Sequence, residues 1–241
     1  MIGKNNLWFL RGLTIDDIML DPQHPFFIAV TDLGDSAVLG GVTLLTGMTL
    51  AATGSRRAAA LLVLAFLAAA AAMGLLKILF YDCGFRFMAL DIRSPSGHAA
   101  LAVVVWGMLA AITARQLAGW RKYLPVLVAA SLTGLIAVTR VTLGFHTLDE
   151  VCIGLLAGMA VMTGSILLLR RAAPHRVNLR GVMLAAAAAI LMLHGLRLPA
   201  ENFIRLLGEQ IRSHVPACGG IKHAMQAVEK SFPSGRERIM K

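Results

Sequence analysis

The chain has 241 residues, of which 57% are hydrophobic and only 15% are charged. Soluble globular domains average roughly 45–50% apolar and about 25% charged residues, so this composition excludes an ordinary water-soluble fold, a disordered chain and a disulfide-stapled miniprotein. The formal net charge is +10, and in a membrane protein the positions of the cations carry more information than their sum.

The predicted elements begin with an N-terminal interfacial segment at residues 1–33, in which Phe26 and Phe27 are typical of side chains that anchor at a membrane surface. Six apolar stretches follow, each near the roughly 20 residues that a helix needs to cross a bilayer. The expected spans are Gly34–Thr53, Ala58–Phe80, Gly97–Ala114, Leu124–Val141, Val151–Leu169 and Gly181–Leu196. The sequence therefore predicts an all-α, polytopic membrane bundle of about six transmembrane helices over residues 34–196.

The remaining residues, 197–241, form a basic C-terminal tail. Within Glu201–Val215, four apolar side chains recur at helical spacing: Phe203, Ile204, Leu207 and Ile211. This pattern is typical of an amphipathic helix that lies on the membrane or packs on the protein's own loops.

Three of the five loops between spans are basic and contain no acid. Their cations are Arg56 and Arg57, then Arg115, Arg121 and Lys122, then Arg170, Arg171, Arg176 and Arg180. Because cytoplasmic loops of membrane proteins are enriched in Lys and Arg, these loops are expected to face the cytoplasm. Both termini and the other two loops are then expected on the outside, although the basic tail does not follow the rule.

The cysteines and two glycines give expectations about a disulfide, a buried side chain and helix packing. Cys83 and Cys218 both fall outside in this topology, where a disulfide between them is one alternative and free thiols are the other. Cys152 lies inside a span and is interpreted as a small buried hydrophobe. Gly154 and Gly158 have a spacing that favours close helix packing, and the oligomeric state stays open.

Polar residues at span ends gather on the predicted external face. They are Lys77, Ser94 to His98, Arg140, His146, Asp149 and Glu150. Since membrane spans disfavour charge, ionisable groups there indicate a functional site. None of these residues was used to derive the orientation, so their agreement is independent support for it.

Together these groups have the chemistry of a phosphate site. Lys77 and Arg140 can hold phosphate oxygens, and the Ser96-Gly97-His98 segment begins a helix, where free backbone N–H groups favour an anion. His146 and Glu150 are four residues apart, so on a helix the carboxylate can orient the imidazole. Two histidines can divide nucleophile and acid roles, which describes phosphoryl transfer through a phosphohistidine without a metal or other cofactor.

The pattern Pro95-Ser96-Gly97-His98, followed by Arg140, five residues, His146, three residues and an acid, resembles two signature motifs of the type 2 phosphatidic acid phosphatase superfamily. The resemblance covers about Lys77–Gly158. It implies that His146 is the nucleophile and His98 the acid for the leaving group. It also implies a phosphate cradle made of Lys77, Ser96, Gly97 and Arg140.

The sequence departs from the family pattern at three positions. After Lys77 the family has six residues and then Arg-Pro, whereas here Arg86 follows after eight without a proline, and Arg93 beside Pro95 is the rival. The Ser that the family has before the downstream Arg is Thr139. The family's Asp falls on Glu150, with Asp149 as the alternative partner of the histidine.

The resemblance implies a metal-independent phosphatase of the plasma membrane, acting at the outer face on lipid phosphates. Expected substrates are phosphatidate, phosphatidylglycerol phosphate, polyprenyl pyrophosphate or lipid A, and neither nucleic acid nor a cofactor is expected. Two alternatives stay open: a non-catalytic protein that binds or moves lipid phosphates, and a phosphotransferase that uses the same site.

Overall fold

The computed structural model describes residues 25–82, 94–171 and 176–196, together with Ile204, Leu206 and Gln210. Its described residues are helical apart from short turns, which confirms the all-α prediction. The α-helices are α2 (Pro25–Asp32), α3 (Ser36–Ala52), α4 (Arg56–Lys77), α5 (Gly97–Ala114), α6 (Leu124–Thr142), α7 (Leu148–Arg170) and α8 (Leu179–Leu193). A π-helical turn, η2 (Ile78–Asp82), extends α4, and a 3-10 turn, η3 (Gly119–Tyr123), precedes α6.

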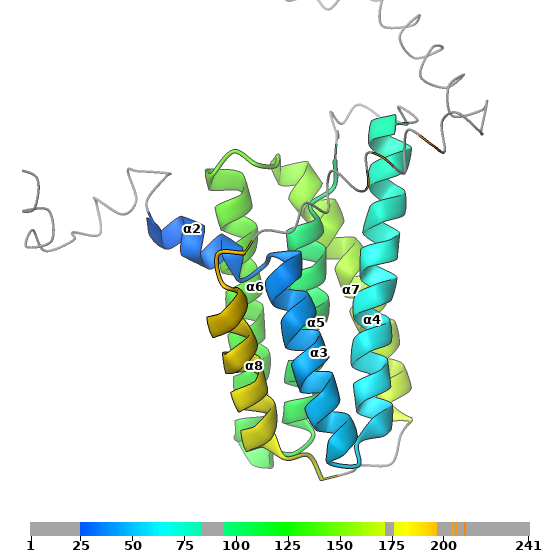
Figure 1. Cartoon of the computed structure of the whole chain (residues 1–241), viewed down its shortest axis with the longest axis vertical. Helices are drawn as coiled ribbons and strands as arrows, with labels where there is room; N and C mark the ends of the chain where they lie inside the picture. Colours follow the sequence, from blue (N-terminus) through cyan, green and yellow to red (C-terminus); the bar gives the residue numbers. More distant parts are fainter. Residues whose placement is uncertain are drawn as a thin grey trace, which may run out of the picture.

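The six helices α3 to α8 run up and down the bundle, while α2 lies across one end of it (Figure 1). Helix α5 is central and packs on α3, α4, α6 and α7. Its composition explains this position, since α5 is apolar on every side and its Ala and Val residues let neighbouring helices approach closely. Helix α8 packs on α3, and α2 packs on the end of α6.

Large apolar side chains on the outer surface belong in lipid. Leu67, Leu127, Val128, Leu156 and Leu191 are each more than half exposed, on α4, α6, α7 and α8. A soluble protein would not leave so many large hydrophobic side chains in water. The bundle is therefore an integral membrane protein by the composition of its surface as well as of its helices.

The structure confirms the helices near all six predicted positions, but not six membrane spans. Four helices are long and apolar enough to cross a bilayer, and a fifth span is obtained if α2 and α3, which meet at a 44° bend, count as one. The shortfall is in α8, whose 15 residues cover about 22 Å, less than the roughly 30 Å of a hydrocarbon core.

One prediction within the fifth span is wrong. Cys152 lies on α7, but its side chain is exposed on the outer face of the helix rather than buried. The residues that α7 turns inward at this level are Val151 and Gly154, so Cys152 faces the position of the lipid.

Several predictions lie outside the described residues: the interfacial segment before Pro25, the Cys83–Cys218 pair, and most of the tail. Of the predicted amphipathic helix, Ile204, Leu206 and Gln210 are helical. Ile204 packs against Ile78 at the end of α4, so this part of the tail lies against the protein itself.

Candidate functional site

Five helix ends meet at one end of the bundle: the amino ends of α3, α5 and α7 and the carboxyl ends of α4 and α6 (Figure 1). Asp35 precedes α3, Lys77 ends α4, His98 lies in the first turn of α5, Arg140 lies in the last turn of α6, and His146 lies in the turn before α7. The up-and-down topology thus gathers residues from across the sequence at one site.

A tight turn after α6 places His146. Gly144 has a φ of +69°, a backbone conformation that favours glycine, and it ends the helix. The backbone amides of Phe145 and His146 then both donate to the carbonyl of Arg140, each at 3.1 Å. His146 is therefore held beside the last turn of α6, close in space to Arg140.

The first turn of α7 orients the imidazole of His146. Thr147 caps the helix, because its hydroxyl accepts from the amide of Glu150 while the Glu150 carboxylate accepts from the amide of Thr147. The same carboxylate oxygen, Oε2, lies 2.9 Å from His146 Nδ1. An ionised carboxylate only accepts, so the imidazole donates through Nδ1 and keeps Nε2 as the nitrogen with a free lone pair.

Glu150 also ties α7 to the start of α5. Its Oε1 accepts from the amide of Ser94 at 2.8 Å, and its backbone carbonyl accepts from the amide of Ser96 at 3.0 Å. Glu150 is buried, whereas the neighbouring Asp149 is exposed. Of the two acids that the sequence offered, Glu150 is the one in contact with the histidine.

Burial lowers the pKa of His146 below its usual value near 6.5. The hydrogen bond with Glu150 acts in the opposite direction, and the positive charges of Arg140 and Lys77 lower the pKa further. The balance favours the neutral imidazole at pH 7, which is the form that can act as a nucleophile. The same charges show that Lys77 and Arg140 lie within electrostatic reach of His146.

The start of α5 provides polar groups beside an open space. Ser96 is fully buried, and its hydroxyl makes no hydrogen bond among the described residues. A Cβ at Gly97 would meet no atom of the described residues within 4 Å, so there is open space beside Gly97 at the start of the helix. A helix amino end with free N–H groups and adjacent space suits an anion.

Asp35 is a site residue that the sequence analysis missed. Its Oδ2 lies 3.5 Å from His98 Nε2, and its Oδ1 accepts from the amide of Ala37 at 2.8 Å and so caps α3. Gly34 makes this approach feasible, because a Cβ there would lie 2.7 Å from Ile136 and 3.5 Å from His98. The available signal was an acid directly before an apolar run, at the same external face as the histidines.

Arg140 is held from two sides. Its Nη1 donates to the hydroxyl of Thr31, on α2, at 3.4 Å, and its guanidinium carbon lies 4.4 Å from the centre of the Phe145 ring. The short helix α2, predicted only as an interfacial segment, thus takes part in the site. Thr139, at the position where the family has Ser, is buried and donates to the Ile136 carbonyl of its own helix.

The candidates for the second cation of the first motif, Arg86 and Arg93, both lie outside the described residues. The described side chains of His, Cys, Asp and Glu form no group of three that could hold a metal ion.

Comparison with known proteins agrees with the motifs. The sequence model of the PAP2 superfamily matches residues 58–174, a region that contains every predicted site residue. A protein described as "Uncharacterized 22.5 kDa protein in cps region", from Klebsiella pneumoniae, is 29% identical over 133 residues, which are 53% of this chain and 63% of that protein. No solved structure matches this chain.

Proposed function

Since this chain carries a PAP2 superfamily domain at residues 58–174, we propose that it is a membrane-bound phosphatase that releases phosphate from lipid phosphates or pyrophosphates through a phosphohistidine. The observation that carries the proposal is the pair of histidines at one end of the bundle, each against a buried carboxylate: His146 with Glu150 and His98 with Asp35. A site that only binds phosphate needs cations, but it needs no histidine oriented by a carboxylate.

His146 is the proposed nucleophile. Its Nδ1–H is held by Glu150, so Nε2 presents a lone pair to phosphorus. The new N–P bond forms as the bond between phosphorus and the lipid oxygen breaks, and the electron pair of that bond leaves with the oxygen. A water molecule then attacks the phosphohistidine, the N–P bond breaks, and free phosphate is released.

His98 is the proposed proton carrier. An imidazolium has two N–H groups, so contact of one nitrogen with Asp35 leaves the other to donate to the departing lipid oxygen. In the second step the now neutral His98 accepts a proton from the attacking water. Asp35 touches neither phosphorus nor the leaving oxygen in this scheme, and is a positioning residue.

The negative charge that develops on phosphate is proposed to lie against Lys77, Arg140, Ser96 and the backbone at Gly97. Stabilisation of the equatorial oxygens by fixed positive groups is the main contribution that proteins make to phosphoryl transfer. Arg86 is the proposed additional cation, with Arg93 as the alternative. No step of the scheme requires a metal ion or a cofactor.

The substrate is proposed to be an amphiphile whose tail stays in lipid while its phosphate reaches the polar end of the bundle. This follows from the position of the site, at the ends of apolar helices whose outer surfaces belong in lipid. The protein is proposed to cross a bacterial plasma membrane six times, with the site facing the outside. Phosphatidate, phosphatidylglycerol phosphate, polyprenyl pyrophosphate and lipid A are the lipids to compare.

A direct test is phosphate release from these lipids by the purified full-length protein, with and without His146→Ala. We expect the variant to lose at least about a hundred-fold in kcat, because no other group of the scheme can form the intermediate. His194→Ala is the matched control, since His194 is an exposed histidine at the end of α8, and it should retain full activity. Wild-type activity should survive EDTA and be inhibited by vanadate.

The same preparation separates the alternatives. Equal phosphate release by wild type and His146→Ala would exclude the proposed mechanism. Tight lipid-phosphate binding without any release would indicate the binding or transport function. Transfer of the phosphate to an added lipid alcohol, in preference to water, would indicate the phosphotransferase.

A further inference from the structure

A second feature lies away from the candidate site, between α5, α6 and α7. It is a groove with a volume of about 720 Å³ that opens on the side of the bundle. Its walls are almost entirely apolar or small, with Val103, Gly107, Val126, Gly134 and Met159 among them. The groove exists because α6 and α7 both pack on α5 but hardly touch each other.

All three cations that line the groove lie at one end of it. Arg115 follows α5, Lys122 precedes α6 and Arg170 ends α7, so each is at the basic end of the bundle, opposite the histidines. No Asp or Glu of the described residues lines the groove. An apolar groove with positive charge at one mouth is complementary to an anionic lipid, which has a charged head at the interface and a chain in the hydrocarbon.

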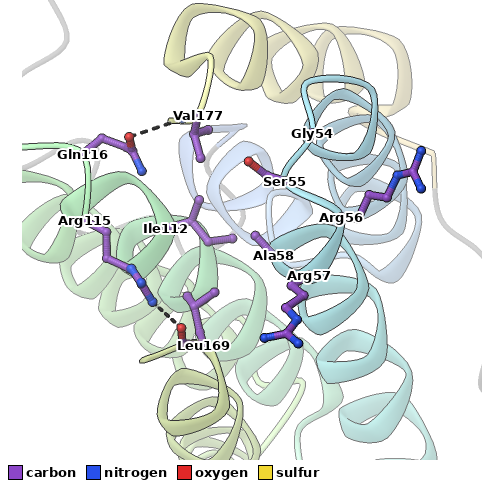
Figure 2. Close-up of a pocket in the computed structure, with 10 residues that line it drawn as sticks. All are labelled: Gly54, Ser55, Arg56, Arg57, Ala58, Ile112, Arg115, Gln116, Leu169 and Val177. Atoms are coloured by element: carbon purple, nitrogen blue, oxygen red, sulfur yellow. Dashed lines mark hydrogen bonds between the residues drawn. The ribbon is translucent and has the colours of Figure 1, made fainter. Parts of the chain in front are cut away.

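Two contacts shape this cationic mouth. Arg115 Nη1 donates to the carbonyl of Leu169, which fastens α5 to α7 at the cationic mouth of the groove. Figure 2 shows this bond from the side of a neighbouring pocket. The Lys122 ammonium lies 5.0 Å from the centre of the Tyr123 ring. Tyrosine with a neighbouring lysine is typical of the membrane–water interface, so this mouth is at headgroup level.

The length of the groove suits one membrane leaflet. Its lining runs from Val103 to Arg115 along α5 and from Leu155 to Arg170 along α7, which corresponds to about 18–22 Å. Half of a bilayer of about 40–45 Å, headgroups included, is about the same distance. A packed layer of Ala99, Ala137 and Val151 lies between the groove and the histidine end, and Leu155, which lines the groove, packs against this layer. The groove is therefore separate from the candidate catalytic site.

We propose that this groove binds an anionic phospholipid of the leaflet at the basic end, with its phosphate at Arg115, Lys122 and Arg170 and one acyl chain along α5 between α6 and α7. The proposal is independent of the catalytic function, because a phosphodiester lipid held at the opposite end of the bundle takes no part in the proposed hydrolysis. The positive loops thus provide a lipid site in addition to their effect on orientation.

The charge requirement is tested by native mass spectrometry of the full-length protein from micelles that contain equal amounts of phosphatidylglycerol and phosphatidylcholine. Wild type should retain phosphatidylglycerol preferentially, and Lys122→Gln/Arg170→Gln should reduce that retention about ten-fold. Arg176→Gln/Arg180→Gln is the control, because it removes the same charge from the same end of the bundle but neither residue lines the groove. An equal loss in both double variants would mean diffuse attraction and would overturn the proposal.

The acyl-chain position is tested by a pair of glycines. Gly134 lines the groove and Gly164 does not, and within the described part of the chain a Cβ at either would meet no atom within 4 Å. Gly134→Leu should fill the groove and reduce phosphatidylglycerol retention, whereas Gly164→Leu should leave it unchanged. Unchanged retention in Gly134→Leu would assign the groove to another occupant, such as a second copy of this chain, and would overturn the proposal even if the charge variant failed to fold.

Discussion

At the scale of single residues, Asp35 has two roles in the structure. One carboxylate oxygen caps α3 through the amide of Ala37, and the other faces His98. Asp35 lies outside residues 58–174, the region matched by the PAP2 superfamily model. The partner of a predicted catalytic histidine is thus provided by a part of the chain outside the family domain.

The two roles of Asp35 can be separated with Asp35→Asn. Asparagine caps helices as well as aspartate does, so we expect a small change in Tm. Removal of the charge should lower kcat for lipid phosphates about ten-fold, because His98 then loses the carboxylate that positions it for proton donation. The rate with p-nitrophenyl phosphate should fall much less, since its leaving group needs no proton.

The control for Asp35→Asn is Asp149→Asn, which removes an exposed acid at the same end of the bundle. It should leave both rates unchanged. An equal fall with the two substrates in Asp35→Asn would contradict the proton-positioning role and would assign Asp35 to helix capping alone.

At the scale of helices, the packing of α7 on α5 determines the spacing of the two motifs. A Cβ at Gly154 would lie 2.3 Å from the carbonyl oxygen of Ser96, and one at Gly158 would lie 2.5 Å from that of Ala100. The prediction that these glycines permit close helix packing is therefore confirmed. The close approach that these glycines permit also shapes the candidate site, because it brings Glu150 to the backbone of Ser94 and Ser96.

Gly154→Ala should force α7 away from the start of α5. We expect a loss of about 1–3 kcal/mol in the free energy of unfolding, since the methyl group meets backbone that cannot move aside. Phosphate release should fall with it, because His98 lies on α5 while Glu150, which orients His146, lies on α7. The measurements are Tm in detergent and kcat on a lipid phosphate.

Gly164→Ala is the control for this substitution, since Gly164 lies on the same helix and a Cβ there would meet none of the described atoms within 4 Å. It should keep or slightly raise Tm, because alanine favours helix more than glycine does. If Gly154→Ala matched Gly164→Ala in both measurements, close approach of α7 to α5 would not be required.

At the scale of the whole molecule, the two ends of the bundle differ in chemistry. The carboxyl ends of α3, α5 and α7 and the amino ends of α4, α6 and α8 lie together at one end, opposite the histidines (Figure 1). The basic residues from which the orientation was predicted lie at or beside these helix ends. The separation of these nine basic residues from His98 and His146 is thus a property of the fold, while the side of the membrane on which each end lies is still a prediction.

That prediction is testable with single cysteines in a chain whose Cys83, Cys152 and Cys218 are replaced by serine. Asp149→Cys lies at the histidine end and Arg176→Cys at the basic end, and both positions are exposed. A membrane-impermeant maleimide should label Asp149→Cys in intact cells and Arg176→Cys only after permeabilisation. The reverse pattern would place the histidines in the cytoplasm.

The sequence by itself predicted the helices and most residues of the candidate site. Apolar runs of about 20 residues indicate membrane helices, and the spacing of His146 and Glu150 is local to one helical turn, so both were readable without a fold. The sequence placed the acid on Glu150 with Asp149 as the alternative, but the contact of Glu150 with the amide of Ser94, which lies before α5, depends on helix packing and was not readable.

Only the tertiary structure decided the contacts between distant segments. Asp35 meets His98, Thr31 meets Arg140, and the groove forms where α6 and α7 diverge over α5. Such contacts arise from how helices pack, and packing depends on side-chain shape on every face at once rather than on any local pattern. The sequence predicted most groups of the candidate site but neither Asp35 nor Thr31, and the packing of the bundle decided which groups meet.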